Sequence, residues 1–187
     1  MLGIMIIDMQ KKFFECIDLE EKLYLLRNQK RLINFADERN IPILSLEYKR
    51  CGQMIESLKK RLENIENYQI PKYNDNGFII AFKKNKKIYY NIESASIKSV
   101  YGGEYTENDK LNSILKNKGI NHLIITGIFK DECVYHTVKG AVKRGYKIFT
   151  SEDLMDCKGW LYDWYKANSN HYKTLDKLFE GINNQNL

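Results

Sequence analysis

Two residues of the chain, Asp8 and Cys133, have reactive side chains at positions where a parallel sheet would bind ligands. Asp8 directly follows the apolar run 2–7, and Cys133 lies shortly after the apolar run 122–126. A carboxylate beside a buried strand costs free energy unless it is paired or functional. A thiol in the first turn of a helix feels unpaired backbone N–H groups, which lower its pKa toward the thiolate. Ligands bind at the carboxyl ends of parallel strands, so both residues are candidates for a reaction site.

The apolar pattern predicts the elements that would position these two residues. Continuous short apolar runs predict buried strands at 2–7, 41–46, 122–126 and 146–150. Helical spacing predicts helices near 18–40, 54–65, 106–118 and 131–144, the first with a capping box at Asp18 and Glu21. The apolar runs 78–82 and 88–92 predict either a hairpin or one sheet strand with an added edge strand. The C-terminal tail is expected to contain one or two helices. This alternation indicates an α/β fold of three layers, α-β-α, with a mostly parallel, doubly wound sheet.

Composition narrows the class of protein further. The chain has 187 residues, 43% apolar and 29% charged, which suits one soluble domain over residues 1–187. No apolar run approaches ~20 residues, so we expect no membrane association. The net charge of +6 is spread along the chain apart from the lysine-rich turn 83–87, so we expect no nucleic-acid partner. The four cysteines lack metal-ligand spacing and a secretion signal is absent, which predicts reduced thiols and a cytoplasmic location.

Two segments around the candidate residues resemble a known family. The first is the opening Ile6-Ile7-Asp8-Met9-Gln10, followed by Phe13 and Phe14. The second runs from Ile124 to Val134 and continues with Thr137, Ala141, Gly145-Tyr146 and Asp153. Together these segments resemble the isochorismatase-like cysteine hydrolases, which include nicotinamidases and N-carbamoyl amidases. The resemblance covers most of residues 1–155 and implies a hydrolase with the family's Rossmann-type fold.

The resemblance also implies roles for individual residues. Cys133 would be the nucleophile that attacks an amide, ureido or enol-ether-type substrate, and Asp8 the base that takes the thiol proton. A cis peptide bond would join Ile128 to Phe129, and the N–H groups of Phe129 and Cys133 would form an oxyanion hole. We expect Phe13, Phe129 and Tyr101 to contact a small-molecule substrate. The family often forms oligomers, so we also expect a homo-oligomer.

The third member of the family's triad, a lysine, is ambiguous in this sequence. If Ser99-Val100-Tyr101 is the family's Ser–small–aromatic step, counting back places the lysine on Asn91. Lys98 is the nearest cation to that slot, and we take it as the catalytic lysine. Lys72 and Lys83 are alternatives; Lys72 begins a shorter version of the motif at 72–78 that leaves a long insertion. A chain without a triad lysine would instead be a non-catalytic relative that binds a small molecule or a protein.

No cofactor or metal is expected from the sequence. Nicotinamidases bind a metal through an Asp-x-His pair and further histidines after the second strand, whereas residues 47–51 here contain no histidine. We therefore predict a metal-independent enzyme and disfavour nicotinamide as substrate. His136, one turn beyond Cys133, is expected to be structural or exposed, and Lys130 to be exposed at the helix start. The sequence does not name the substrate.

Overall fold

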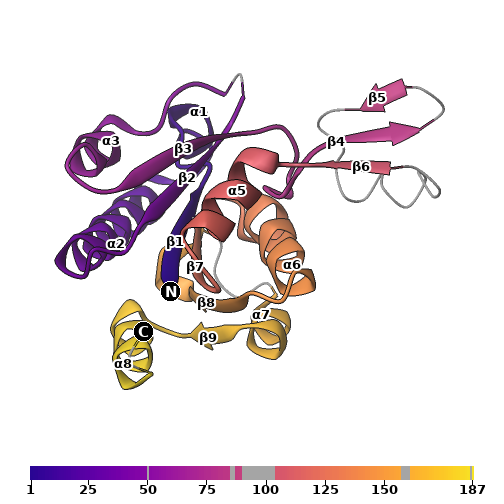
Figure 1. Ribbon diagram of the computed structural model, residues 1–187. Coiled ribbons are helices and arrows are strands. Elements are labelled where there is room, and N and C mark those ends of the chain that lie inside the picture. Colours follow the sequence, from indigo (N-terminus) through magenta and orange to yellow (C-terminus); the bar gives the residue numbers. More distant parts are fainter. Residues whose placement is uncertain (50, 85–86, 90–103, 157–160, 186) are drawn as a thin grey trace.

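A six-stranded sheet forms the centre of the protein (Figure 1). The computed structural model describes residues 1–49, 51–84, 87–89, 104–156, 161–185 and 187. The strand order is β3-β2-β1-β7-β8-β9, and every pairing is parallel. The strands are β1 (Leu2–Ile7), β2 (Ile43–Tyr48), β3 (Asn67–Lys72), β7 (His122–Gly127), β8 (Lys147–Ser151) and β9 (Asn170–Tyr172). The predicted parallel α/β sheet is confirmed.

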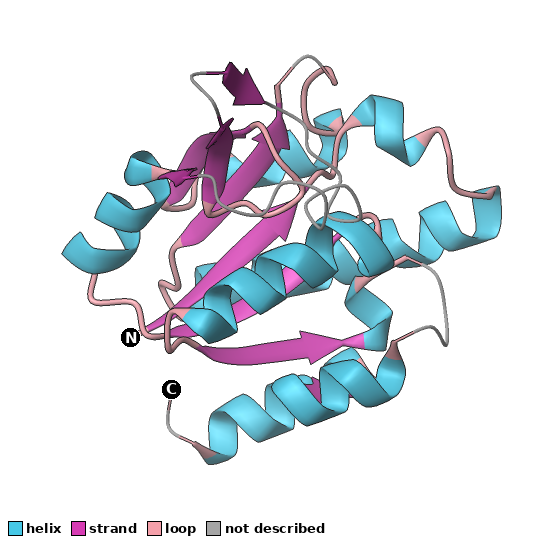
Figure 2. Ribbon diagram, turned by 90° about the vertical axis from the view of Figure 1, so that its right-hand side faces the viewer, coloured by secondary structure: helices cyan, strands magenta, loops and turns pink. Residues whose placement is uncertain are grey.

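Helices cover both faces of this sheet, which gives the predicted three layers (Figures 1 and 2). One face packs against α2 (Leu19–Glu38), α3 (Glu56–Leu62) and α8 (Leu175–Asn184). The other packs against α5 (Asp109–Asn117), α6 (Tyr135–Lys143) and α7 (Tyr162–Asn168). Within the described residues, no helix is long and apolar enough to cross a membrane.

Strand β1 is central because both of its faces are apolar. All six of its residues are buried. Ile4 and Ile6 belong to the core beneath α2, whereas Met5 and Ile7 belong to the core beneath α6, as the alternation of side chains in a strand requires. The chain continues through α1 (Lys11–Phe14) to α2. There Asp18 accepts a hydrogen bond from the Glu21 N–H at 2.9 Å, as the capping pattern predicted.

A small antiparallel sheet is inserted between β3 and α5. It contains β4 (Ile79–Lys84), β5 (Lys87–Tyr89) and β6 (Glu104–Glu107) in the order β5-β4-β6, and it projects from the main sheet in Figure 1. The predicted hairpin is therefore present. The helix expected from residue 106 begins instead at Asp109, because Thr106 pairs with β4 and the Asn108 side chain caps the helix by accepting from the Leu111 N–H at 3.3 Å.

Candidate active site

Asp8 ends β1 in a conformation that turns its side chain out of the strand. Its φ is +55°, in the left-handed region that Asp adopts more readily than most residues. Its N–H still donates to the Leu46 carbonyl of β2 at 2.9 Å. The Asp8 side chain is fully buried. Strained backbone of this kind often marks a functional position.

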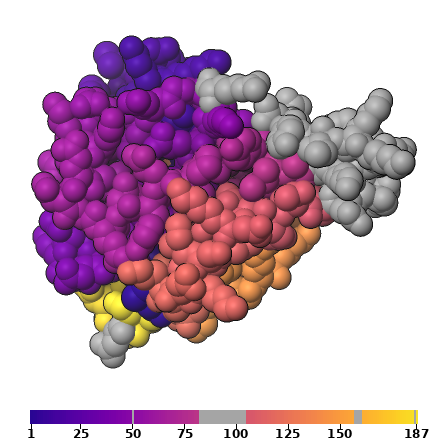
Figure 3. Space-filling model, turned by 45° about the horizontal axis from the view of Figure 1, so that its top comes forward, coloured from indigo at the N-terminus to yellow at the C-terminus, as the bar shows by residue number. Residues whose placement is uncertain are grey.

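Gln10, two residues later, fastens the ends of β1 and β2 together. Its side-chain amide donates to the carbonyls of Tyr48 at 3.1 Å and Gly52 at 2.5 Å, and its oxygen accepts from the Tyr48 N–H at 2.7 Å. The Gln10 side chain is fully buried. Gln10 thereby fixes the Tyr48 backbone next to Asp8. In the space-filling view, the N-terminal residues, coloured indigo, lie at the top of the molecule beside the purple residues that come after them in the sequence (Figure 3).

Cys133 is placed by a sharp turn after β7. Gly127, with φ +140°, lies so close to β1 that a Cβ atom would be 2.0 Å from the Ile7 carbonyl oxygen. Phe129 then takes a left-handed conformation with φ +63°. The single π-helical turn Lys130–Val134 follows and leads into α6. The expected cis bond between Ile128 and Phe129 is wrong: described peptide bonds are all trans, and left-handed Phe129 makes the turn instead.

Lys72, at the end of β3, pairs with Asp8. The distance from Lys72 Nζ to Asp8 Oδ2 is 2.6 Å, and both side chains are 0% exposed. Asp8 is therefore compensated by an opposite charge, and the cost expected for an unpaired carboxylate does not arise. The same ammonium lies 4.5 Å from the centre of the Tyr48 ring, and it is near enough to Cys133 to lower the pKa of the thiol against the effect of burial. Within the described residues, Asp8 Oδ1 has no hydrogen-bond partner.

Lys72 is one of the three lysines that the sequence left open, and the structure places it beside Asp8 and close to Cys133. Lys98, Asn91 and Tyr101 lie outside the described residues, as does the side chain of Lys83. The insertion that made Lys72 look improbable is the small sheet β4-β5-β6, which follows the Lys72 motif without disturbing it.

Burial dominates the electrostatics of the thiol. It raises the pKa of Cys133 well above its usual range; Lys72 opposes this effect, and the carboxylates of Asp8 and Asp75 add to it. The lowered pKa expected from the helix N-terminus is therefore wrong, because Cys133 is only 4% exposed. Burial lowers the pKa of Lys72, but Asp8 and Cys133 more than offset this and raise it overall. The resting centre holds a neutral thiol beside a Lys–Asp ion pair.

Asp75 is a site residue that the sequence reasoning missed. The Cys133 thiol donates to Asp75 Oδ1 at a sulfur–oxygen distance of 3.5 Å. The Asp75 carbonyl in turn accepts from the Thr137 hydroxyl at 3.2 Å. The available signal was its position three residues after Lys72, in the motif 72–78.

Aromatic rings lie beside this centre. The Phe13 ring packs edge-on against Phe129 at 5.3 Å and against Tyr48 at 6.1 Å between centroids. Two of the three residues expected to contact substrate are therefore neighbours, and Tyr48 joins them to Lys72. Burial lowers the pKa of His136 to about 4, an effect to which Lys139 and Lys72 add, so this ring is neutral near pH 7.

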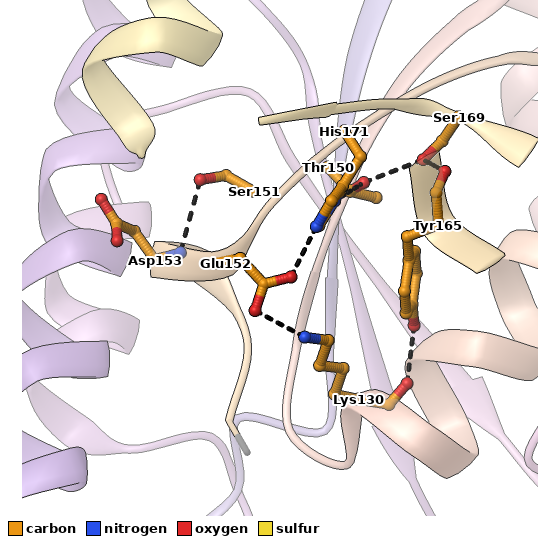
Figure 4. A network of polar contacts seen from close by, with 8 residues as sticks. All are labelled: Lys130, Thr150, Ser151, Glu152, Asp153, Tyr165, Ser169 and His171. Carbon is orange, nitrogen blue, oxygen red and sulfur yellow. Dashed lines mark hydrogen bonds and ion pairs between the residues drawn. The ribbon is translucent and has the colours of Figure 1, made fainter. Parts of the chain in front are cut away.

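Behind the nucleophile turn lies a buried polar network (Figure 4). Lys130 Nζ is 2.6 Å from Glu152 Oε2, and the other Glu152 oxygen is 2.5 Å from His171 Nε2. The Tyr165 hydroxyl donates to the Lys130 carbonyl at 2.6 Å. Lys130 is only 1% exposed, so the expectation of an exposed Lys130 is wrong: its charge is paired inside the protein. The network holds the turn that carries Cys133.

The backbone N–H groups at the start of this turn contact Asp156. The Lys130 N–H donates to Asp156 Oδ1 at 2.8 Å, and the Phe129 N–H contacts the same carboxyl. Burial raises the pKa of Asp156 to about 6, although both N–H groups oppose this. The Phe129 N–H, expected in an oxyanion hole, thus lies near the Asp156 carboxyl, and the oxyanion hole of the Phe129 and Cys133 N–H groups stays a prediction.

A groove of about 840 Å³ is lined mainly by α1 and residues 51–56, and Asp8, Lys72 and Cys133 are not among its lining residues. The catalytic candidates are enclosed, and the groove is a separate surface feature. Within the described part of the chain, no three His, Cys, Asp or Glu side chains gather in a way that could hold a metal ion.

Comparisons with solved structures show where this fold occurs. N-carbamoylsarcosine amidase from Thermoplasma acidophilum matches with a TM-score of 0.66 and 16% identity, over 91% of this chain and 94% of that one. The nicotinamidase from Staphylococcus aureus matches with a TM-score of 0.67 and 17% identity, over 93% of this chain and 98% of that one. An isochorismatase-like hydrolase from Alkaliphilus metalliredigens matches with a TM-score of 0.69 and 15% identity, over 96% of this chain and 98% of that one. At these identities the likeness shows the fold.

Family membership rests on the sequence itself. A search of curated protein sequences gives no significant match. Residues 3–159, however, match the family model of the isochorismatase domain. Since that match spans most of the chain and includes Asp8, Lys72 and Cys133, the protein belongs to the isochorismatase family of hydrolase-like α/β proteins.

Proposed function

We propose that the protein is a cysteine hydrolase in which Asp8, Lys72 and Cys133 form the catalytic centre. The observation that carries this proposal is the fully buried Lys72–Asp8 pair, 2.6 Å long, whose two charges both act on the pKa of the Cys133 thiol. A buried ion pair contributes little net stability. Asp8, Lys72 and Cys133 follow or end β1, β3 and β7 at the carboxyl edge of the sheet, where chemistry takes place in folds of this kind.

The arrangement supports a two-step hydrolysis of an amide or ureido bond. In the first step the Cys133 proton moves to the Asp8 carboxylate while sulfur bonds to the carbonyl carbon. The carbon–nitrogen bond then breaks, and the Asp8 carboxyl returns its proton to the leaving nitrogen. In the second step Asp8 takes a proton from water, the hydroxide attacks the thioester, and the proton returns to sulfur as the carboxylic acid leaves. Lys72 stays protonated throughout and stabilises the anionic forms of its two neighbours.

Lys72 replaces Lys98 as our candidate for the triad lysine. The reason is its contact with Asp8, which a lysine in the family's role requires. The non-catalytic alternative rested on Asn91 in the lysine slot. With Lys72 beside Asp8, that reason for doubting catalysis no longer holds, and we keep the proposal that the protein is an enzyme.

Relatives support a small amide or ureido substrate and an oligomer. The two named relatives of similar fold are an N-carbamoylsarcosine amidase and a nicotinamidase. A further relative, from Escherichia coli, is an octameric hydrolase. We propose that this chain also acts on a small molecule, without a metal, and forms a homo-oligomer in the cytoplasm.

Ammonia release from a panel of small primary amides and ureido compounds tests the proposal. The wild-type protein should hydrolyse at least one class of compound, and Cys133→Ala should abolish the activity without loss of folding. Cys16→Ala is the matched control, because this cysteine is exposed and its sulfur only donates to the Lys12 carbonyl. Activity that survives in Cys133→Ala would refute the proposal.

A further inference from the structure

Asp75 adds a second carboxylate to the thiol's surroundings. Its Oδ1 atom lies 3.5 Å from Cys133 Sγ, whereas Asp8 is paired with Lys72. Asp75 is half-buried, whereas Asp8 is fully buried. Its negative charge also reaches the Tyr48 hydroxyl, since it adds to the effect of burial in raising the pKa of Tyr48. Asp75 therefore acts on both the nucleophile and Tyr48, one of the aromatic residues of the site.

The position of Asp75 is fixed by the helix that follows the nucleophile. Thr137, in α6, donates to the Asp75 carbonyl at 3.2 Å and accepts from the Gly77 N–H at 3.0 Å. Asn74 and Asn76 tighten the same turn, with the Asn76 N–H donating to Asn74 Oδ1 at 3.2 Å. Because Thr137 lies one helical turn after Cys133, the carboxylate and the thiol are carried by one rigid unit.

We propose that Asp75 determines specificity: it favours substrates with an N–H donor or a positive charge beside the scissile carbonyl, and it excludes those with a carboxylate there. This inference rests on the proposed function. The attacked carbon must come within ~3–3.5 Å of sulfur, so the atoms attached to it pass close to Asp75 Oδ1. A donor at that point forms a charge-assisted hydrogen bond with the carboxylate.

Charge in the centre strengthens the same preference. The charges of Asp8 and Lys72 oppose each other within their ion pair, whereas the Asp75 carboxylate lies directly beside the thiol. An anionic substituent would enter a low-dielectric site beside a like charge. Among the substrate types considered, amides and ureido compounds are therefore favoured over enol ethers that carry a carboxylate beside the reacting carbon.

Three methanethiosulfonate reagents of one chemistry and different charge test the inference without any substrate. They carry a 2-aminoethyl, a methyl or a 2-sulfonatoethyl group and are cationic, neutral and anionic. In each case the Cys133 sulfur bonds to the reagent's sulfenyl sulfur, methanesulfinate leaves, and the thiol proton passes to solvent. Rates for the Cys133 peptide are measured by mass spectrometry and divided by the rates for 2-mercaptoethanol. The cation-to-anion ratio cancels any change in the pKa of the thiol.

We expect the wild-type ratio to exceed that of 2-mercaptoethanol by about tenfold or more. Asp75→Asn should bring it close to the reference, Asp75→Glu should keep the preference, and Asp37→Asn, an exposed charge on α2, should leave it unchanged. A reactive Cys133 with no cation preference in the wild type overturns the inference alone, even if Asp75→Asn does not fold. A Cys133 that reacts with none of the reagents overturns the proposed nucleophile as well.

Discussion

Replacing Lys72 with methionine tests the ion pair at the heart of the site. Methionine has a similar length and fits a buried apolar position, but it leaves the Asp8 carboxylate without its opposite charge. Both side chains are 0% exposed, so water cannot take over the role of Lys72. Asp8 Oδ1 has no hydrogen-bond partner within the described residues, which removes another source of compensation.

The expected cost follows from this burial. Removing one partner of a buried ion pair destabilises a protein by ~3–5 kcal/mol, because an unpaired charge remains inside. We expect Lys72→Met and Asp8→Asn each to lower the free energy of unfolding by about that amount. The double variant, which removes both charges, should lose clearly less than the sum of the two.

Urea unfolding followed by circular dichroism at pH 7.5 measures these free energies. The matched control is Lys60→Met, which breaks the exposed pair between Lys60 and Glu56, whose side chains are 68% and 67% exposed. That change should cost under ~0.5 kcal/mol. The reasoning is refuted if Lys72→Met costs no more than the control, or if the losses in the double variant are simply additive.

Three further predictions concern the nucleophile turn. Asp156→Asn should stabilise the protein by up to about 3 kcal/mol at pH 7.5 but not at pH 4. The reason is that the folded pKa of about 6 lies roughly two units above the ordinary 3.8, so the penalty for the charged form grows between these pH values. Thermal melting at both pH values measures this, and an equal effect at both would contradict it. Glu152→Gln should destabilise the protein at pH 7, since Lys130 is left buried without its carboxylate. The loss in free energy of unfolding should shrink as the pH falls below 4.5, because burial raises the pKa of Glu152 but the hydrogen bonds from His171 and Lys130 outweigh it and lower the pKa overall. A pH-independent loss in urea titrations would argue against this. Gly127→Ala should cost about 3 kcal/mol or more, because its Cβ would lie 2.0 Å from a backbone oxygen, and a melting temperature equal to that of wild type would exclude this close approach.

The parts of the fold that the sequence predicted best are those buried on both faces. The central strands β1 and β7 appear as continuous apolar runs because helices cover both of their sides. The two missed strands of the six-stranded sheet, β3 and β9, are its edges. Edge strands need fewer apolar residues and tolerate proline, so β3, with Pro71 before Lys72, carries no strong strand pattern.

The same edge strand explains why the lysine was misplaced. Lys72 can be recognised as a site residue only once β3 is known to lie beside β2, because this pairing directs its end toward Asp8. Without β3, the next apolar runs took the place of the third strand and moved the count toward Lys98. Asp8 and Cys133 needed no such step, since each follows a strand of obvious pattern.

The pH dependence of Cys133 alkylation by iodoacetamide, in wild type, Lys72→Met and Lys98→Met, tests the central claim most directly. Circular dichroism first establishes that each variant is folded under the assay conditions. Because Lys72 opposes the effect of burial on the thiol, its loss should raise the pKa of Cys133 further. Lys98→Met should titrate like the wild type. A raised thiol pKa in Lys98→Met, together with an unchanged one in Lys72→Met, would contradict the assignment of Lys72 to the catalytic centre.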